Sequence, residues 1–429
     1  MIALQRLRSG LQQRLSGRPK IRAAFQYAGS SIICQAVRFL GVLFSTRHIR
    51  PEEFGLYAQA FLGLVFVSVI RDIGQGNALI SYQGTDRRYV LYNFKLNLLL
   101  GLLAAFLLLA VPAWVAAVPH TIRRVAPILA AIAIVENLSQ AQLIVAQKSY
   151  RFFLLGCVDV AAVGSWTLTL LFAVGRVEGF VVLLLAPLVE DIVRFVALMA
   201  VVGWRYVGWA GGADLRAYYF GKFARTAIAK TFFETLAGKT DFLLLSTLSS
   251  LWQLGAYERT LQFVRIPLSL SVNLLDRVLL VSYSKEQADA AALRGIVRKG
   301  SLFIGVAVFS ATALVSLGLL FLLKFALGPE WPPIILHHWW IALPFTLVTP
   351  LTWNYNLVFQ GTGRSKQLLK NYCVTVFFEL GLGILLVGRF GAAGMLAARG
   401  FACLVLLGYQ MKTINRLFSD EPQPSIQKG

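Results

Sequence analysis

The residues with the chemistry to bind a ligand are charged and amide side chains inside long apolar segments. In residues 255–281, polar side chains recur at steps of three and four, which places them on one face of a helix. They are Glu258, Gln262, Arg265, Ser269, Asn273 and Asp276. A charge at the centre of a bilayer costs at least ~2.5 kcal/mol, so this pattern predicts a helix that lines a water-filled cavity.

Other apolar segments also carry charges. Arg38, Asp159, Glu379 and Arg399 each stand alone in their segments, whereas Glu190 and Arg194 are spaced to pair along a helix. For any single residue, an ion pair or hydrogen bond that joins two helices is an equally good explanation. Arginine and lysine outnumber acids near the first, second, seventh and eighth spans, which indicates an anionic ligand, because guanidinium groups match phosphate geometry.

The sequence contains no recognisable catalytic constellation. It has no His/Cys cluster at metal-ligand spacing, no phosphate-binding P-loop and no nucleophile elbow. The cysteines show no paired spacing, so we expect neither a disulfide nor a metal site, and no cofactor. They are Cys34, Cys157, Cys373 and Cys403. The sequence therefore favours a protein that is not an enzyme.

The composition is that of a membrane protein. Hydrophobic residues make up 57% of the chain and charged residues 14%, and the mean hydropathy is +0.67. Soluble domains carry about a quarter charged residues. The apolar runs are too long for a β-barrel and predict an all-α polytopic fold of about 12 transmembrane helices. The net charge is +21, and the basic residues lie between the apolar runs, where the positive-inside rule places them. The charge therefore does not indicate nucleic-acid binding.

The predicted spans define two bundles. They cover residues 24–45, 53–80, 92–118, 122–146, 152–174, 180–202, 223–248, 255–281, 300–327, 334–360, 367–387 and 391–414. The predicted domains are a basic arm (1–22), a six-helix bundle (23–204), a linker (205–222), a second six-helix bundle (223–414) and a tail (415–429). A charged link is expected at 285–299. Basic residues concentrate in the loops on the side of both termini, so we expect both termini to be cytoplasmic in a bacterial inner membrane.

A short sequence occurs twice. Phe54-Gly55-Leu56-Tyr57 opens one span, and Leu254-Gly255-Ala256-Tyr257 opens another. Internal repeats in membrane transporters typically relate two pseudo-symmetric halves, with the binding site between them. The repeat therefore predicts two pseudo-symmetric bundles around a central cavity.

The motifs resemble those of one family. Arg50-Pro51-Glu52-Glu53-Phe54-Gly55-Leu56-Tyr57 followed by Asp72-Ile73-Gly74 resembles the signature of Wzx-type polysaccharide flippases, in the multidrug/oligosaccharidyl-lipid/polysaccharide exporter superfamily. Further similar motifs span nearly the whole chain. They are Lys239-Thr240-Asp241, Arg265-Ile266-Pro267, Gly328-Pro329-Glu330-Trp331 and Gly361-Thr362-Gly363-Arg364.

The resemblance implies alternating access and an undecaprenyl-diphosphate-linked oligosaccharide as substrate, for O-antigen, exopolysaccharide or capsule synthesis. A polysaccharide polymerase and chain-length machinery are possible partners. The residues expected to bind diphosphate and sugar are Arg38, Arg71, Lys239, Arg259, Gln262, Arg265 and Asn273. The residues expected to couple transport to an ion are Glu136, Glu234 and Asp241.

Two other functions fit parts of the sequence. A cation-coupled multidrug exporter of the same superfamily shares the fold, but its cationic substrates favour an acidic cavity. A membrane polysaccharide polymerase or ligase shares the apolar composition, but the outer loops are short and no catalytic cluster is present. The abundance of Arg and Lys favours the flippase.

Overall fold

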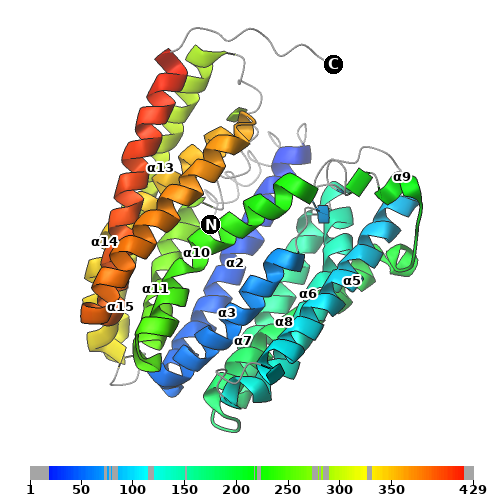
Figure 1. Cartoon of the computed structure of the whole chain (residues 1–429), viewed down its shortest axis with the longest axis horizontal. Helices are drawn as coiled ribbons and strands as arrows, with labels where there is room; N and C mark the ends of the chain where they lie inside the picture. The colour runs from blue at the N-terminus through cyan, green and yellow to red at the C-terminus, as the bar shows by residue number, and fades with distance from the viewer. Residues whose placement is uncertain are drawn as a thin grey trace, which may run out of the picture. The chain divides into compact units, whose positions relative to one another are not determined.

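The computed structural model is α-helical (Figure 1). It describes residues 19–71, 75–76, 79, 86–114, 120–149, 152–216, 218–219, 224–272, 279, 282–283, 289–325 and 331–419. Within these ranges the structure has an isolated β-bridge between Val174 and Val177 and no β-strand. The prediction of an all-α fold is confirmed.

The chain divides into two compact units. Unit 1 comprises residues Met1–His48 and Gly63–Thr231, and unit 2 comprises Ile49–Leu62 and Phe232–Gly429. The boundary therefore passes through the helix α3 (Pro51–Arg71), whose first residues pack in unit 2. Each unit is described separately below.

Unit 1 is a bundle of long helices. Its helices are α2 (Pro19–His48), α5 (Arg87–Trp114), α6 (His120–Lys148), α7 (Phe152–Ala173) and α8 (Gly179–Val202). The short η1 (Trp204–Tyr206) and α9 (Ala213–Arg216) follow. The helix α2 packs against α7, α5 packs against α6, and α8 packs against both α6 and α7. This packing brings the middle of α2 to the charged turn of α8.

Unit 2 is a second bundle. Its helices are α10 (Ala224–Leu248), which enters unit 2 at Phe232, α11 (Leu251–Val272), α13 (Ala290–Phe325), α14 (Trp331–Gly361) and α15 (Ser365–Ser419). The helix α11 packs against α13, α14 and α15. Two predicted spans meet inside α15 at Gly391, where φ is 55° and ψ is −129°. A positive φ favours glycine, so the chain turns here between two helical segments.

One predicted link is wrong in part. The helix α13 begins at Ala290, whereas residues 285–299 were expected to form a charged link. Oδ1 of Asp289 accepts hydrogen bonds from the backbone N–H groups of Ala291 and Ala292, both at 2.9 Å, which caps the helix. Leu293 and Val297 are buried in the core of unit 2, so this extension is packed rather than loose.

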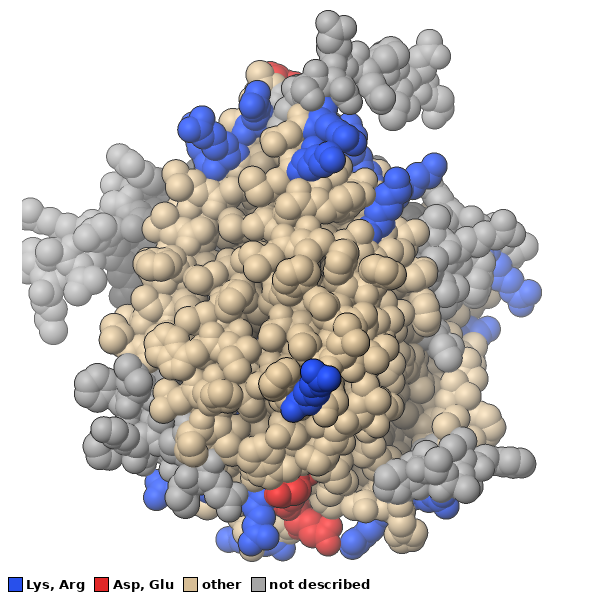
Figure 2. Space-filling model, turned by 60° about the vertical axis from the view of Figure 1, so that its left-hand side comes forward, with Lys and Arg blue, Asp and Glu red and all other residues tan. Residues whose placement is uncertain are grey.

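The surface of the helices suits a bilayer. Eight helices within the described residues are long and apolar enough to cross a membrane, while α8, α10 and α11, which carry interior charges, fall outside this set. Leu302, Phe309 and Leu314 of α13 are 67–73% exposed, as lipid-facing side chains would be. Figure 2 shows one face on which residues other than Lys, Arg, Asp and Glu cover most of the middle, with a basic side chain among them, while other Lys and Arg side chains gather at the two ends. The chain is a multi-pass membrane protein.

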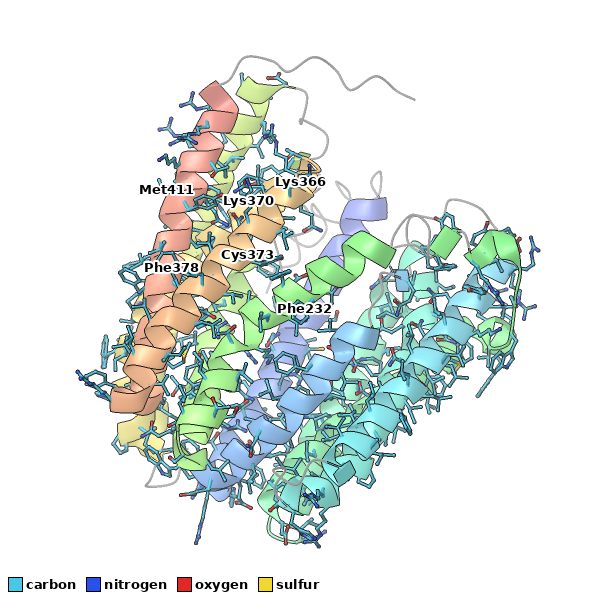
Figure 3. The ribbon with its side chains drawn as sticks, viewed as in Figure 1. Phe232, Lys366, Lys370, Cys373, Phe378 and Met411 are labelled. Atoms are coloured by element: carbon cyan, nitrogen blue, oxygen red, sulfur yellow. The ribbon has the colours of Figure 1, made fainter. Side chains whose placement is uncertain are left out.

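The first half of α15 illustrates this division. Lys366 and Lys370 lie near its start, followed by Cys373 one turn further (Figure 3). All three are exposed. Basic residues at the end of an apolar helix are typical of the boundary between membrane and water.

The two copies of the repeated sequence touch each other in unit 2. A Cβ atom on Gly55 would overlap the carbonyl oxygen of Leu251, the first residue of α11. Reciprocally, a Cβ on Gly255 would overlap the carbonyl oxygen of Pro51, the first residue of α3. Because only glycine permits this backbone approach, the repeat specifies the crossing of α3 and α11.

Candidate functional site

Unit 1 contains a cluster of ion pairs that joins three helices. We call it the unit 1 charge cluster; its members are Arg38 on α2, Asp159 on α7, and Glu190, Asp191 and Arg194 on α8. Nη2 of Arg38 lies 2.7 Å from Oε1 of Glu190, and Nη2 of Arg194 lies 2.8 Å from the same oxygen. Arg194 also reaches Asp191 at 3.0 Å and Asp159 at 3.8 Å.

This cluster confirms one predicted pair. Glu190 and Arg194 pair along α8 as their spacing predicted. Arg38, predicted to bind substrate, and Asp159 each stand alone in their segments, and both lie near a charge of opposite sign on another helix, in line with the ion-pair explanation. The Arg38 guanidinium also lies 5.0 Å from the centre of the Trp166 ring. Helix packing made these pairs, since their members lie far apart in sequence.

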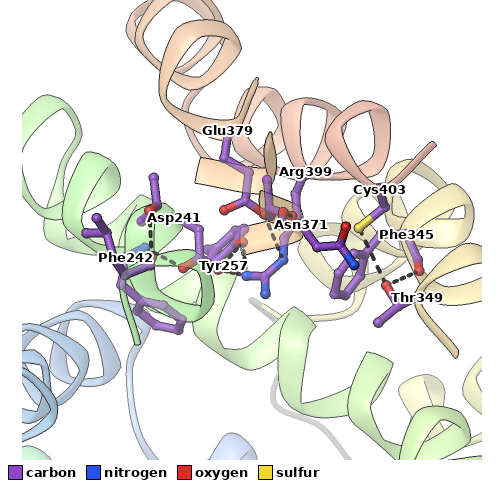
Figure 4. A network of polar contacts seen from close by, with 12 residues as sticks. Asp241, Phe242, Tyr257, Phe345, Thr349, Asn371, Glu379, Arg399 and Cys403 are labelled. Atoms are coloured by element: carbon purple, nitrogen blue, oxygen red, sulfur yellow. Dashed lines mark hydrogen bonds and ion pairs between the residues drawn. The ribbon is translucent and has the colours of Figure 1, made fainter. Parts of the chain in front are cut away.

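Unit 2 contains a second group of charges, in which the acids are buried and the arginine is 15% exposed. We call it the unit 2 buried network; its members are Asp241, Tyr257, Glu379 and Arg399 (Figure 4). Oδ2 of Asp241 accepts a hydrogen bond of 2.6 Å from the Tyr257 hydroxyl and forms an ion pair with Arg399. Nε of Arg399 lies 3.7 Å from Oε1 of Glu379, and its guanidinium packs on the Phe345 ring.

This network changes the interpretation of three residues. Glu379 and Arg399, which each stand alone in their predicted spans, are partners, in line with the ion-pair explanation. Asp241 was predicted to couple transport to an ion, but the structure places it at 0% exposure against Arg399 and Tyr257. Tyr257 belongs to the repeated sequence, and no pattern in the sequence indicates that its hydroxyl contacts an aspartate.

The polar face of α11 is largely satisfied by its own side chains. Nε2 of Gln262 donates to Glu258 at 2.6 Å, and Nη1 of Arg259 donates to Gln262 at 3.0 Å. The Arg259 side chain is 1% exposed, and its guanidinium stacks 3.5 Å from the centre of the Phe54 ring. Arg259 and Gln262, both predicted to bind substrate, are therefore engaged within the protein.

Two of the predicted binding cations differ from the rest. Lys239 on α10 and Arg265 on α11 have no ion-pair partner within the part of the chain that the structure describes. Arg265 is exposed, whereas Lys239 is half-buried with its ammonium group 4.7 Å from the centre of the Phe242 ring. Cations without an ion-pair partner suit an anionic group.

The remaining predicted residues are dispersed. Glu136 is half-buried on α6 in unit 1, and Glu234 is exposed on α10, where Oε1 accepts a hydrogen bond of 3.2 Å from the Tyr372 hydroxyl. Asn273 and the side chain of Arg71 lie outside the described residues. The structure therefore brings Lys239, Asp241, Arg259, Gln262 and Arg265 into unit 2, and Arg38 and Glu136 into unit 1.

Several solved structures are similar to the chain. An inward-facing MATE-family multidrug transporter of the MOP superfamily matches with a TM-score of 0.68 and 13% identity, over 93% of this chain and 99% of that one. A MOP-superfamily transporter from Pyrococcus furiosus, described as having a binding pocket of reversed polarity, matches with a TM-score of 0.59 and 16% identity, over 94% and 97%. The lipid II flippase MurJ matches with a TM-score of 0.63 and 13% identity, over 92% and 87%.

These likenesses define the class of protein: a polytopic α-helical membrane protein with the fold of MOP-superfamily transporters. No curated protein sequence matches the chain. A family model described as "Polysaccharide biosynthesis protein" matches residues 45–336, which is more than half of the chain. The chain belongs to this polysaccharide biosynthesis family, and the resemblance predicted from its motifs is confirmed.

Proposed function

We propose that this protein is a flippase that moves a lipid-diphosphate-linked oligosaccharide across the inner membrane by alternating access. The observation that carries the proposal is that the cations Lys239 and Arg265 in unit 2 have no ion-pair partner among the described residues. A diphosphate diester carries two negative charges and would compensate both. The polysaccharide biosynthesis family and the fold shared with a lipid II flippase support this substrate class.

The contrast with the other interior arginines supports this assignment. Arg194, Arg259 and Arg399 each face a carboxylate within 4 Å. An arginine that is already neutralised gains little from an anionic ligand, because the ligand must replace an existing ion pair. Lys239 and Arg265 would gain a new charge-assisted contact without that cost.

The proposed topology follows from charge. The basic arm (1–22), the linker (205–222) and the tail (415–429) would be cytoplasmic, and the bundles 23–204 and 223–414 would be the two moving halves. Gly55 and Gly255 occupy corresponding positions in the two copies of the repeat, and each lies against the first residue of the other copy's helix. This reciprocal contact supports two related halves. A polymerase and chain-length machinery would then act on the translocated substrate.

The proposal is tested by complementation of a flippase-deficient strain. We expect Lys239→Ala and Arg265→Ala each to lower surface polysaccharide by about ten- to a hundredfold, because a hydrogen bond to a charged group contributes about 1.5–3 kcal/mol. Arg389→Ala, which removes another exposed cation from α15, should leave the polymer unchanged. Full polymer from both site variants at normal protein level would contradict the proposal.

The unit 1 charge cluster favours a second candidate. It contains more acids than arginines, which suits a cationic ligand, and cation-coupled multidrug exporters share the fold. Efflux of a cationic dye by the purified protein in vesicles, with no flipping of a fluorescent diphosphate lipid, would establish this alternative in place of the flippase.

A further inference from the structure

The chain that leads out of α8 forms a defined turn. Gly203 has a φ of 89°, and its backbone N–H donates to the carbonyl oxygen of Met199 at 2.9 Å. Because a positive φ favours glycine, the chain leaves the direction of α8 at this residue. The short η1 follows, and the N–H of Val207 donates to the carbonyl oxygen of Trp204 at 3.0 Å. The predicted linker (205–222) therefore begins with ordered structure directly at the end of α8.

Aromatic side chains pack this segment against the start of α5, where Figure 1 shows α9 beside it. The ring centres of Tyr219 and Tyr92 lie 5.2 Å apart, and those of Tyr218 and Tyr89 lie 5.3 Å apart. The Tyr219 hydroxyl also donates to the carbonyl oxygen of Tyr89 at 3.0 Å. Leu215 and Tyr219 are buried in the same small core. The segment is therefore packed on α5 within unit 1.

The surface formed by residues 86–95 and 204–216, which we call the linker surface, has more cations than acids. Its acids are Asp86 and Asp214, and both lie near the guanidinium of Arg88, at 2.9 Å and 3.7 Å. Its other cations have no ion-pair partner within the described residues. They are Arg87, Lys95, Arg205 and Arg216. Five cations and two acids leave a net charge of +3, which attracts anions.

Two tryptophans lie among these cations. Trp204 is 68% exposed and Trp209 is 64% exposed. Nζ of Lys95 lies 5.4 Å from the centre of the Trp209 ring, and the Arg205 guanidinium lies 4.8 Å from the centre of the Tyr206 ring. Tryptophan is enriched where a bilayer meets water, because its ring is apolar and its indole N–H is polar. Exposed tryptophans beside cations without acidic partners therefore suit a layer of lipid headgroups.

The place of the linker surface in the fold identifies the anion. The helix α5 is long and apolar enough to cross a membrane. Leu99 and Phe106 of α5 are 45% and 65% exposed, as lipid-facing side chains would be. Lys95 precedes Leu99 by four residues, which is about 6 Å along a helix. The cations therefore lie about one helical turn from side chains suited to lipid, where phospholipids carry their phosphate groups.

We infer that the linker surface binds the phosphate groups of anionic phospholipids, and that Trp204 and Trp209 enter the headgroup layer. Lys95, Arg205 and Arg216 contact the phosphates, because no acid in the described chain neutralises them. The attraction depends on charge and is therefore weakened by salt. This inference concerns the contact of unit 1 with the membrane and does not depend on the substrate of the protein.

The first test compares two pairs of exposed arginines in the full-length protein. Native mass spectrometry measures binding of phosphatidylglycerol and of phosphatidylcholine with the same acyl chains. Arg205→Gln combined with Arg216→Gln should weaken phosphatidylglycerol binding by about ten- to thirtyfold, because each basic residue near anionic lipid contributes roughly fivefold. The matched control combines Arg124→Gln, at the start of α6, with Arg176→Gln, after α7, and should change it by less than about twofold. Phosphatidylcholine binding should be equal in all three proteins.

The second test locates the lipid without any substitution. Hydrogen–deuterium exchange of the wild-type protein is followed in nanodiscs of phosphatidylcholine with and without phosphatidylglycerol. We expect the amides of residues 204–216 to exchange several-fold more slowly with phosphatidylglycerol present, and 1 M salt to remove most of this difference.

Four results would overturn the inference. They are equal phosphatidylglycerol affinity in the two double variants, equal exchange of residues 204–216 in both kinds of nanodisc, displacement of the lipid by millimolar inorganic phosphate, and slowing of exchange by a short-chain isoprenyl diphosphate but not by phosphatidylglycerol. The third would assign the surface to a soluble anion and the fourth to a diphosphate lipid. None of these results tests Lys239 and Arg265, which lie in unit 2.

Discussion

The unit 1 charge cluster and the unit 2 buried network contain the same kinds of groups in different surroundings. In unit 1, Arg194 lies between carboxylates of α7 and α8, and in unit 2, Arg399 lies between carboxylates of α10 and α15. In unit 1, Arg38 is 39% exposed and shares its acidic oxygen with a second arginine. In unit 2, Asp241 and Glu379 have side chains 0% and 1% exposed, and Arg399 is the arginine that joins them.

Because of this difference, removing an arginine should cost a different free energy in the two regions. Removing one partner of a fully buried ion pair leaves an uncompensated charge, which costs about 3–5 kcal/mol. The same removal at a solvent-accessible pair costs little, because water replaces the partner. Glu190 of the unit 1 cluster keeps Arg194 when Arg38 is removed, whereas Arg399 joins α10, α11 and α15 through Asp241 and Tyr257.

The largest effect expected from this comparison is at Arg399. Arg399→Met leaves Asp241 and Glu379 buried without a cation, so we expect the free energy of unfolding to fall by about 3–5 kcal/mol. The matched change in unit 1, Arg38→Met, should cost less than about 1 kcal/mol, because Glu190 keeps Arg194. Thermal unfolding of the purified variants, followed by tryptophan fluorescence, measures both.

A second variant separates charge from packing. Combining Asp241→Asn with Arg399→Met should destabilise the protein less than the sum of the two single changes, because the double variant removes both members of the pair. Equal losses from Arg399→Met and Arg38→Met would show that the two regions do not differ in the way described here.

An intermediate effect is expected at the glycines beside each region. Gly255 lies two residues before Tyr257. Gly255→Ala places a methyl group against the backbone of Pro51, which cannot move aside easily. We expect a loss of about 1–3 kcal/mol. Gly41→Ala in unit 1 meets the side chain of Trp166, which can shift, so its loss should be smaller.

Gly238→Ala provides the control for these glycine variants. No atom lies within 4 Å of a Cβ at this helical position. Alanine should stabilise the helix there by about 0.5–1 kcal/mol. The midpoint of thermal unfolding should rank Gly238→Ala highest and Gly255→Ala lowest; the reverse order of Gly41→Ala and Gly255→Ala would contradict the assigned contacts.

The smallest effect is expected at an ion pair outside both regions. Asp86, just before α5, accepts hydrogen bonds from the backbone N–H of Arg88 at 2.8 Å and from its Nε at 2.9 Å. These bonds favour the ionised carboxylate and lower the pKa of Asp86. Its contribution to stability is present above the ordinary pKa of aspartate and is lost as the pH falls through the lowered folded-state pKa.

Asp86→Asn tests this ion pair, for which we expect the smallest change in stability. The thermal midpoint of the variant should lie slightly below that of the wild type at neutral pH, and the difference should vanish in acid. High salt should also reduce the difference, because Arg88 is exposed and Asp86 is partly exposed. A difference that grows as the pH falls would mean that the carboxylate is not stabilised by Arg88.

Some parts of the site were predictable and others were not. The pair of Glu190 and Arg194 follows from helical spacing, since both residues lie on one turn of α8. The repeated glycines indicated two related elements, although their mutual contact is visible only in the structure. No local pattern connects Asp241 to Arg399, because their partnership depends on how α10 and α15 pack.

The amino-acid sequence alone was enough to establish the helices, their apolar faces and the membrane as surroundings, because these follow from residue type and from periodicity within one segment. The tertiary structure decided which charges neutralise one another. Arg38 and Glu190 are 152 residues apart and Arg399 and Asp241 are 158 apart, so only helix packing brings each pair together. The strength of an interior charge depends on its nearest partner and its access to water, and both are properties of the folded chain.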